Sequence, residues 1–201
     1  QLQMALSSWM LLYQYTGEER IKEDMKFIAD YYLSHSLSPS GAEWANIPYP
    51  YNTLIYSGIY DGDMVIGKYF TQPDNAGSFG IELIHLYKII GTAGHGQTPT
   101  GIYLESAVNI ANTLAKHTSE GDDFKSPMPF KVNALTGEPG KLLNNSGNGS
   151  VTALSDYTSD WSATMELFIE LIKMNKGDVI LYQQAFHKIL NWMKKYPLRN
   201  N

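Results

Sequence analysis

The sequence predicts an all-α fold of three helical hairpins, and two observations support this prediction. Three segments follow the order helix, glycine turn, helix, with the turns at Gly17, Gly91 and Gly177, where a left-handed residue can end a helix. The second helix of each segment carries apolar or amphipathic residues at i, i+4, i+7, i+8 and i+11, which is one face of an α-helix. These faces start at residues 21, 103 and 181, so the hairpin recurs about every 80 residues.

About six main helices follow from this pattern. Thr71 and Asp74 in TQPD have the spacing of a capping box, so we expect Asp74 to stabilise the start of the third helix. Asp160 in YTSDWS precedes the fifth helix and is a candidate for its N-cap. Strand signals are weak, and MVIGKYF at 64–70 predicts one short strand at most. The expected helices span residues 2–15, 19–36, 77–90, 101–117, 161–175 and 178–196.

The links between the hairpins, near residues 37–76 and 118–160, are much longer than the turns inside them. We call these links the first and the second connection. Loops of this length without regular structure are uncommon in compact domains and are usually functional. We therefore expect one domain over residues 1–201 whose function lies in its two connections.

Composition narrows the possible partners. The net charge is −5, and Arg20 and Arg199 are the only arginines, so nucleic acid is not an expected partner. No apolar run approaches the ~18 residues of a membrane span. The absence of cysteine excludes disulfides, thiol nucleophiles and thiolate zinc sites. No signal peptide is visible, and the compartment stays open, with a periplasmic or secreted location favoured for a protein that degrades glycans.

Aromatic and acidic residues gather in both connections. Sugars present apolar C–H faces and a rim of hydroxyls, so a sugar site needs flat aromatic rings beside carboxylates and amides. The alternative is that these rings give the long loops a small core of their own. The candidate sugar-contacting residues are Trp44, Tyr49, Tyr60, Tyr69, Tyr157 and Trp161.

The hairpins also resemble those of a known superfamily. Turns such as HLYKIIG, close to the pattern LY-x-x-TG, and second helices of the type A-x-x-IA-x-x-L are similar to those of six-hairpin (α/α-toroid) glycosidases and polysaccharide lyases. The resemblance implies that the long loops build a carbohydrate-binding cleft at one end of the helices. It also implies that acidic residues in this cleft perform the chemistry.

A complete toroid has six hairpins, whereas this chain supplies three. SWMLLYQY near the start and MELFIELIKM near the end are too apolar for an exposed position. We therefore expect an incomplete toroid whose open ends are covered by the missing hairpins of a longer polypeptide or by self-association.

Glycoside hydrolysis requires two carboxyl groups that face the scissile bond. Asp63 and Asp160 are the candidate pair because they lie in successive connections, which a toroid places at the same end. DGD at 61–63 indicates a turn first, and a catalytic role for Asp63 comes second. Elimination by a lyase is less expected, because it needs a cation and a His or Tyr base, and the connections lack Arg and His. His117 falls at a helix end, where imidazole complements the helix dipole.

Two functional hypotheses follow. The first is a glycoside hydrolase with a cleft built by the two connections and with no cofactor. No histidine pair has metal-ligand spacing on one helix face, so no metal site is expected either. The second is a helical-repeat module that binds a glycan or a protein without turning it over.

Overall fold

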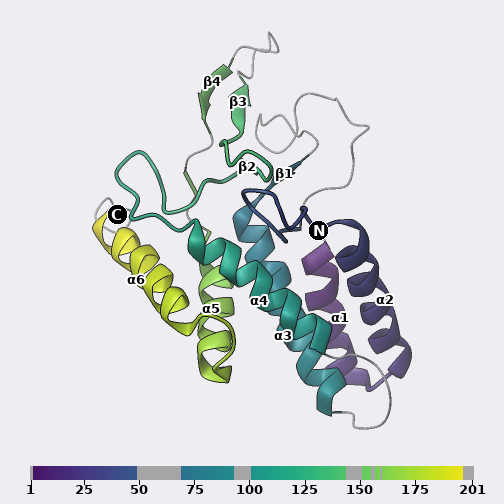
Figure 1. Cartoon of the computed structure of the whole chain (residues 1–201). Helices are drawn as coiled ribbons and strands as arrows, with labels where there is room; N and C mark the ends of the chain where they lie inside the picture. Colours follow the sequence, from purple (N-terminus) through teal and green to yellow (C-terminus); the bar gives the residue numbers. More distant parts are fainter. Residues whose placement is uncertain are drawn as a thin grey trace.

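The computed structural model describes residues 2–48, 69–92, 101–143, 151–154, 157–158 and 160–196 (Figure 1). This part of the chain is mostly helical and confirms the all-α prediction. The third helix begins four residues before the expected start at residue 77, because Pro73 suits the first helical position and Asp74 in the first turn complements the dipole. The six helices are α1 Leu2–Thr16, α2 Glu19–His35, α3 Pro73–Thr92, α4 Gly101–Lys116, α5 Ser162–Met174 and α6 Val179–Lys195.

In the ranges that the structure describes, four short strands accompany the helices. β1 (Phe70–Thr71) pairs antiparallel with β2 (Val132–Asn133), which joins the first connection to the second. β3 (Lys141–Leu143) pairs antiparallel with β4 (Val151–Leu154). The strand expected at 64–70 is represented in the described residues by Phe70 alone, and β2, β3 and β4 were not predicted.

The glycine turns are as expected in two of the three hairpins. Gly17 (φ 70°) and Gly177 (φ 71°) have left-handed backbone, although in the third hairpin the residue that ends α5 is Asn175 (φ 52°). The prediction for Gly91 is wrong, because α3 continues through Gly91 to Thr92.

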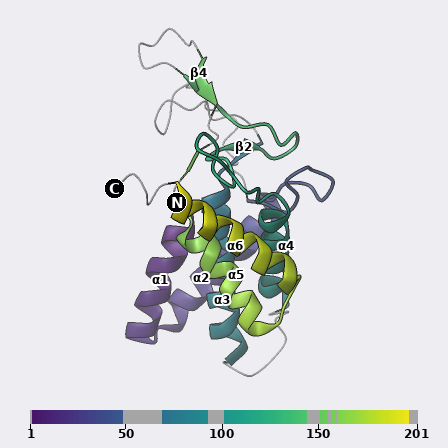
Figure 2. The same ribbon diagram turned by 90° about the vertical axis from the view of Figure 1, so that its left-hand side faces the viewer.

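The first helices of the hairpins form a row. α3 lies in the middle of this row and contacts both α1 and α5. The second helices pack on the row, with α4 against α3, α5 and α6 (Figure 2). Polar contacts join neighbouring hairpins: Tyr103 Oη donates to Asp30 Oδ1 at 2.6 Å, and Lys88 Nζ lies 2.6 Å from Glu170 Oε2.

The core contains the faces predicted for the second helices. α4 is the most deeply placed, and the predicted residues of α2 and α6 are buried or half-buried. Lys188, the one charged member of these faces, is half-buried because its Nζ donates to the carbonyl of Thr118 at 3.1 Å. The predicted face of α4 is fully buried at Tyr103, Ala107, Ile110, Ala111 and Leu114.

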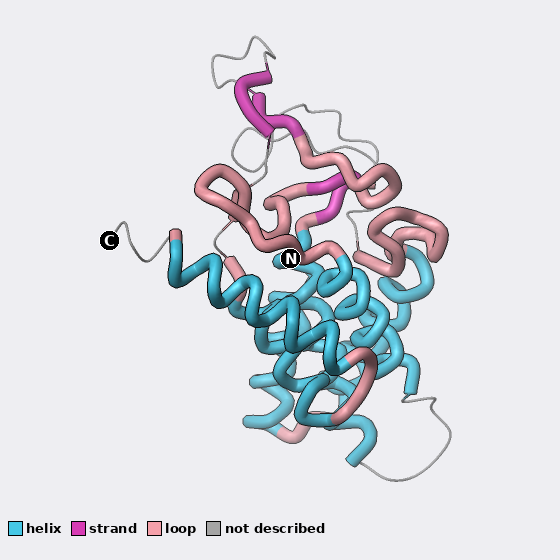
Figure 3. Tube along the Cα trace, turned by 60° about the vertical axis from the view of Figure 1, so that its left-hand side comes forward, coloured by secondary structure: helices cyan, strands magenta, loops and turns pink. Residues whose placement is uncertain are grey.

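The apolar residues of MELFIELIKM, which were expected to need cover from outside this chain, are covered within it. In α5, Leu167, Phe168 and Leu171 are fully buried against the rest of the core, and the exposed positions of this helix are polar. None of the helices in the described ranges is long and apolar enough to cross a membrane. The described parts of both connections lie at the same end of the helices (Figure 3).

Candidate functional site

The two connections are tied to each other by backbone hydrogen bonds. Trp44 N donates to Ala134 O at 2.8 Å, and Ala134 N donates to Tyr69 O at 2.7 Å. Next to these bonds, Thr71 Oγ1 donates to Pro48 O at 2.6 Å. Ala134 therefore lies between two separate stretches of the first connection and fixes their position relative to the second.

The loop that carries Trp44 is also fixed internally. Ser38 Oγ donates to the Trp44 carbonyl at 2.5 Å and accepts the Ile47 amide at 2.9 Å, which closes the loop on a buried hydroxyl. Thr113 Oγ1 of α4 donates to Ala45 O at 2.6 Å and fastens the loop to the helix. The residues before and after Trp44 are thus held in one conformation.

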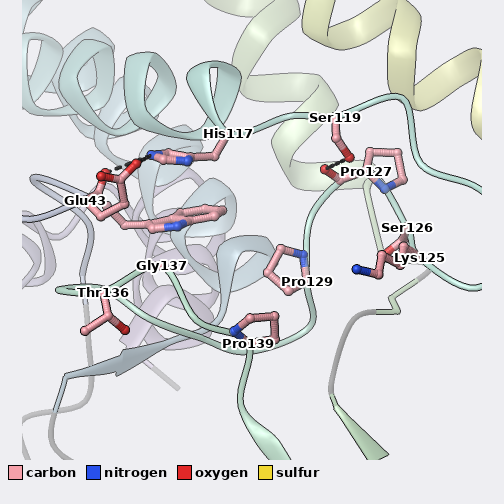
Figure 4. Close-up of a pocket in the computed structure, with 11 residues that line it drawn as sticks. Glu43, His117, Ser119, Lys125, Ser126, Pro127, Pro129, Thr136, Gly137 and Pro139 are labelled. Atoms are coloured by element: carbon pink, nitrogen blue, oxygen red, sulfur yellow. Dashed lines mark hydrogen bonds and ion pairs between the residues drawn. The ribbon is translucent and has the colours of Figure 1, made fainter.

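A pocket of about 380 Å³ opens between the connections (Figure 4). One side comes from the fixed loop of the first connection, and the others come from the end of α4 and from the second connection. Its lining combines an aromatic pair, prolines and polar side chains. The lining residues are Glu43, Trp44, His117, Ser119, Lys125, Ser126, Pro127, Pro129, Thr136, Gly137 and Pro139.

His117 is the best-positioned titratable group in this pocket. Its imidazole stacks on the indole of Trp44, with ring centroids 4.3 Å apart and planes 13° from parallel. Nε2 lies 2.8 Å from the backbone carbonyl of Glu43 (Figure 4). Because a carbonyl accepts only, we assign the proton of the neutral ring to Nε2, and the lone pair then resides on Nδ1.

The surroundings of His117 favour its neutral form. Burial lowers the pKa of the imidazole, and the positive charge of Lys116 acts in the same direction. The carbonyl and the carboxylate of Glu43 oppose this shift but do not reverse it. The Glu43 carboxylate is half exposed, with Oε1 at 3.8 Å from His117 Nε2 and 3.9 Å from Lys116 Nζ. The pocket thus presents a neutral imidazole beside an accessible carboxylate.

The wall opposite Trp44 is held by side-chain-to-backbone bonds. Asp122 Oδ1 accepts the amides of Phe124 and Lys125 at 2.7 and 2.8 Å, which closes a tight turn there. Ser126 Oγ donates to Met128 O at 2.6 Å and accepts the Thr158 amide at 2.9 Å. These bonds preform the wall before any ligand arrives.

Trp44 and Trp161, two of the predicted sugar-contacting residues, are core residues here. Trp44 lines the pocket but is 3% exposed, so it supports His117 rather than offering a free face. Trp161 is 2% exposed and packs edge-on against Trp192, with centroids 6.1 Å apart. For these two rings the structure agrees with the alternative that loop aromatics form a core.

The other predicted residues are more scattered. Tyr157 is 45% exposed and touches Trp192 edge-on, and Tyr69 is half-buried immediately before β1. Asp160 is exposed and accepts from Ser162 Oγ at 3.4 Å, outside the lining of the pocket. Its predicted N-cap role is wrong, because Trp161 occupies the N-cap position of α5. Asp63, Tyr49 and Tyr60 lie outside the described residues.

Sequence reasoning missed His117 as a pocket residue. Its position at the end of α4 suggested a dipole role, and its partner Glu43 lies 74 positions away in the chain. No local pattern connects residues that far apart. The available signal was the Glu43–Trp44 pair, an acidic residue beside an aromatic one in the first connection.

Comparisons with known proteins give this chain no relative. No family model, no curated protein and no solved structure matches it. Within the ranges that the structure describes, no group of three or more His, Cys, Asp or Glu residues is placed to hold a metal ion.

The pocket can bind a small polar ligand that has apolar faces. Three prolines supply apolar surface, while the Glu43 carboxylate, the Ser119 hydroxyl and His117 Nδ1 supply hydrogen-bonding groups. Among its described lining residues, Glu43 is the one carboxylate. Acid–base hydrolysis of a glycosidic bond in this pocket would thus need a second carboxyl group from elsewhere in the connections.

Proposed function

We propose that this chain is a carbohydrate-active domain of the α/α-toroid type that binds a saccharide in the pocket between its connections. The observation that supports this most is the position of the pocket: both long connections meet at one end of a row of helical hairpins and enclose it. Its volume of about 380 Å³ lies within the range of small-molecule sites.

The polar and apolar groups of the pocket suit a sugar. The C–H face of a pyranose would rest on the prolines, and its hydroxyls would bond to the Glu43 carboxylate and to His117 Nδ1. A hydroxyl can both donate and accept, so it complements an ionised carboxylate and a neutral imidazole equally well. The Trp44 stack and the hydrogen bond to the Glu43 backbone keep the imidazole in place, which lowers the entropic cost of binding.

Binding is tested by calorimetric titration with a panel of neutral and acidic oligosaccharides. We expect at least one saccharide to bind, and Glu43→Gln and His117→Ala each to weaken it by about tenfold or more, equivalent to ~1.4 kcal/mol. Glu105→Gln, an exposed change on α4 away from the pocket, is the matched control and should bind as the parent does. Absence of binding to the whole panel, or equal affinity in all variants, would contradict the proposal.

Glycoside hydrolysis is the enzymatic form of this proposal. The carboxyl pair expected from the sequence, Asp63 and Asp160, would then act on a part of the saccharide that extends beyond the described lining of the pocket, in which Glu43 is the one carboxylate. For a saccharide that binds, release of new reducing ends is followed in the parent, in Asp63→Asn and in Asp160→Asn. We expect both variants to lose product formation while keeping the melting temperature of the parent. Full activity in both would remove the catalytic assignment.

The alternative is binding without turnover. The single carboxylate in the described lining favours it, because hydrolysis needs two. A saccharide that binds with the dependence on Glu43 and His117 described above, but gives no product on prolonged incubation, would establish this alternative.

A further inference from the structure

The described lining of the pocket contains one lysine, Lys125, whose backbone is held in place. Lys125 lies on the wall opposite Trp44, in the turn that Asp122 closes. Besides accepting the Lys125 amide, Asp122 donates its own amide to the Lys125 carbonyl at 2.7 Å. The next residue, Ser126, is buried and hydrogen-bonded through its hydroxyl. The exposed side chain of Lys125 therefore starts from a fixed point of the pocket wall.

The ammonium group of Lys125 is available to a ligand. In the described part of the chain, no carboxylate forms an ion pair with it. The carboxylate of Asp122, three residues earlier, accepts the backbone amides of the turn instead. The side-chain nitrogen of Lys125 points toward the prolines of the lining (Figure 4).

The charges of the pocket are arranged with a direction. Glu43 lies on the side opposite Lys125 (Figure 4), and its carboxylate is 3.9 Å from the ammonium of Lys116. The imidazole of His117 is neutral and adds no charge. Among the described lining residues and their ion-pair partners, the charge of Lys125 is the one left unbalanced, in a protein of net charge −5. An anionic group of a ligand is thus attracted to Lys125 and repelled by Glu43.

We propose that the saccharide bound in this pocket is acidic: a hexuronate whose C6 carboxylate lies against the Lys125 ammonium, while its ring hydroxyls bond to Glu43 and His117. The inference rests on the proposed saccharide binding and adds the chemical class of the saccharide. A hexuronate differs from the corresponding hexose only at C6, so its ring keeps the same apolar face for the prolines. Lys125 is then the residue that selects an acidic saccharide over a neutral one.

Calorimetric titration with matched saccharides tests this selection. Oligosaccharides of galacturonate and of glucuronate are each compared with their carboxyl-reduced forms, which keep the configuration of the ring but carry no charge. For at least one pair, we expect the acidic form to bind about fivefold more tightly than the reduced form at low ionic strength. The ratio should shrink as salt is added, because salt screens an exposed ion pair.

Variants of Lys125 separate its role from that of Glu43. Lys125→Gln should lower the affinity for the acidic form to that of the reduced form and leave the reduced form unaffected, whereas Lys125→Arg should keep the preference. Glu43→Gln should weaken both forms and leave the preference, because both forms carry the ring hydroxyls. Lys176→Gln is the matched control: it removes the same charge at an exposed position between α5 and α6, away from the connections (Figure 1).

The outcomes distinguish this inference from the proposed function. Equal or tighter binding of the reduced forms would overturn the acidic class and leave saccharide binding in place. A preference for the acidic form that persists in Lys125→Gln would overturn the role of Lys125. Tighter binding of a sulfated neutral oligosaccharide than of either uronate would overturn the carboxylate as the anion. If none of these saccharides binds, the proposed function fails and this inference fails with it.

Discussion

At the scale of single residues, two histidines show how the surroundings decide protonation. Burial against Trp44 lowers the pKa of His117 from the ordinary 6.5. The carboxylate of Glu82, 3.4 Å away, raises the pKa of His85 from the same value. The two shifts have opposite sign because desolvation opposes the charged form, whereas a neighbouring carboxylate favours it.

These shifts predict opposite effects of pH on stability. For His117, the unfolded chain binds the proton more readily, so its contribution is present above pH 6.5 and is lost as the pH falls below that value. For His85, the contribution is present below pH 6.5 and is lost as the pH rises through the higher folded pKa. Urea unfolding at about pH 5.5 and 8 measures both effects.

When the pH is lowered from the higher to the lower value, we expect the free energy of unfolding to fall less in His117→Gln than in the parent. In His85→Gln, the contribution that protonated His85 makes to the free energy of unfolding at the lower pH should be absent. Each variant serves as the control of the other, since both replace a partly buried imidazole by a neutral amide. The same direction of change in both variants would contradict the assignment.

At the scale of elements, glycines allow α3 to approach α5 closely. A Cβ on Gly77 would lie 2.8 Å from the Cα of Thr164, and one on Gly80 would lie 2.6 Å from Leu167 Cδ2. The first neighbour is backbone, which cannot move aside as a side-chain end can. The contact between α3 and α5, at the end of the helices nearest the connections, therefore depends on Gly77.

Gly77→Ala should destabilise the fold by about 1–3 kcal/mol, because the methyl group forces α3 and α5 apart. Gly101→Ala is the matched control: it also adds a methyl group to a helix, but no atom lies within 4 Å of the new Cβ. That variant should be neutral or slightly stabilised through its better helix propensity. Thermal unfolding compares the two, and equal melting temperatures would argue against close packing at Gly77.

At the scale of the whole molecule, one core joins the three hairpins. Buried side chains run without a break from Leu6 and Met10 of α1, through α3 and α4, to Ile189 and Trp192 of α6. Trp44 and Trp161 belong to the same core, near the connections. Because α3 contacts helices of all three hairpins, no hairpin in the described chain has a core of its own.

The molecule should therefore unfold in one cooperative step. Helix content measured by far-ultraviolet circular dichroism and the burial of the indoles measured by tryptophan fluorescence should change at the same denaturant concentration. Two separated midpoints would contradict unfolding as one cooperative unit.

Much of the helical architecture could be predicted from the sequence. The repeated face at i, i+4, i+7, i+8 and i+11 located α2, α4 and α6, since burial follows a 3.6-residue period. The error at Gly91 arose because glycine permits a left-handed turn but does not impose one. The short strands were missed because two- or three-residue pairs depend on partners distant in sequence, as Phe70 depends on Asn133.

For the candidate site, local sequence indicated the two connections correctly but not the side chains that line the pocket. Trp44 was expected near a ligand and does line the pocket, yet its ring is covered by His117. Trp161, at the border between the second connection and the fifth expected helix, was also expected to contact a sugar, although its position beside Trp192 buries it. Aromatic residues suit both a sugar site and a core, and only their neighbours decide between the two.

The sequence by itself determined the helical hairpins, the two long connections and the apolar character of α1, because all three depend on residues near one another in the chain. Tertiary structure decided which stripe of α1 is buried, which connection aromatics belong to the core, and how Glu43 meets His117 across 74 positions. The physical reason is that a helix and its apolar face are set by residues a few positions apart in the chain. A pocket forms only where packing brings distant segments together.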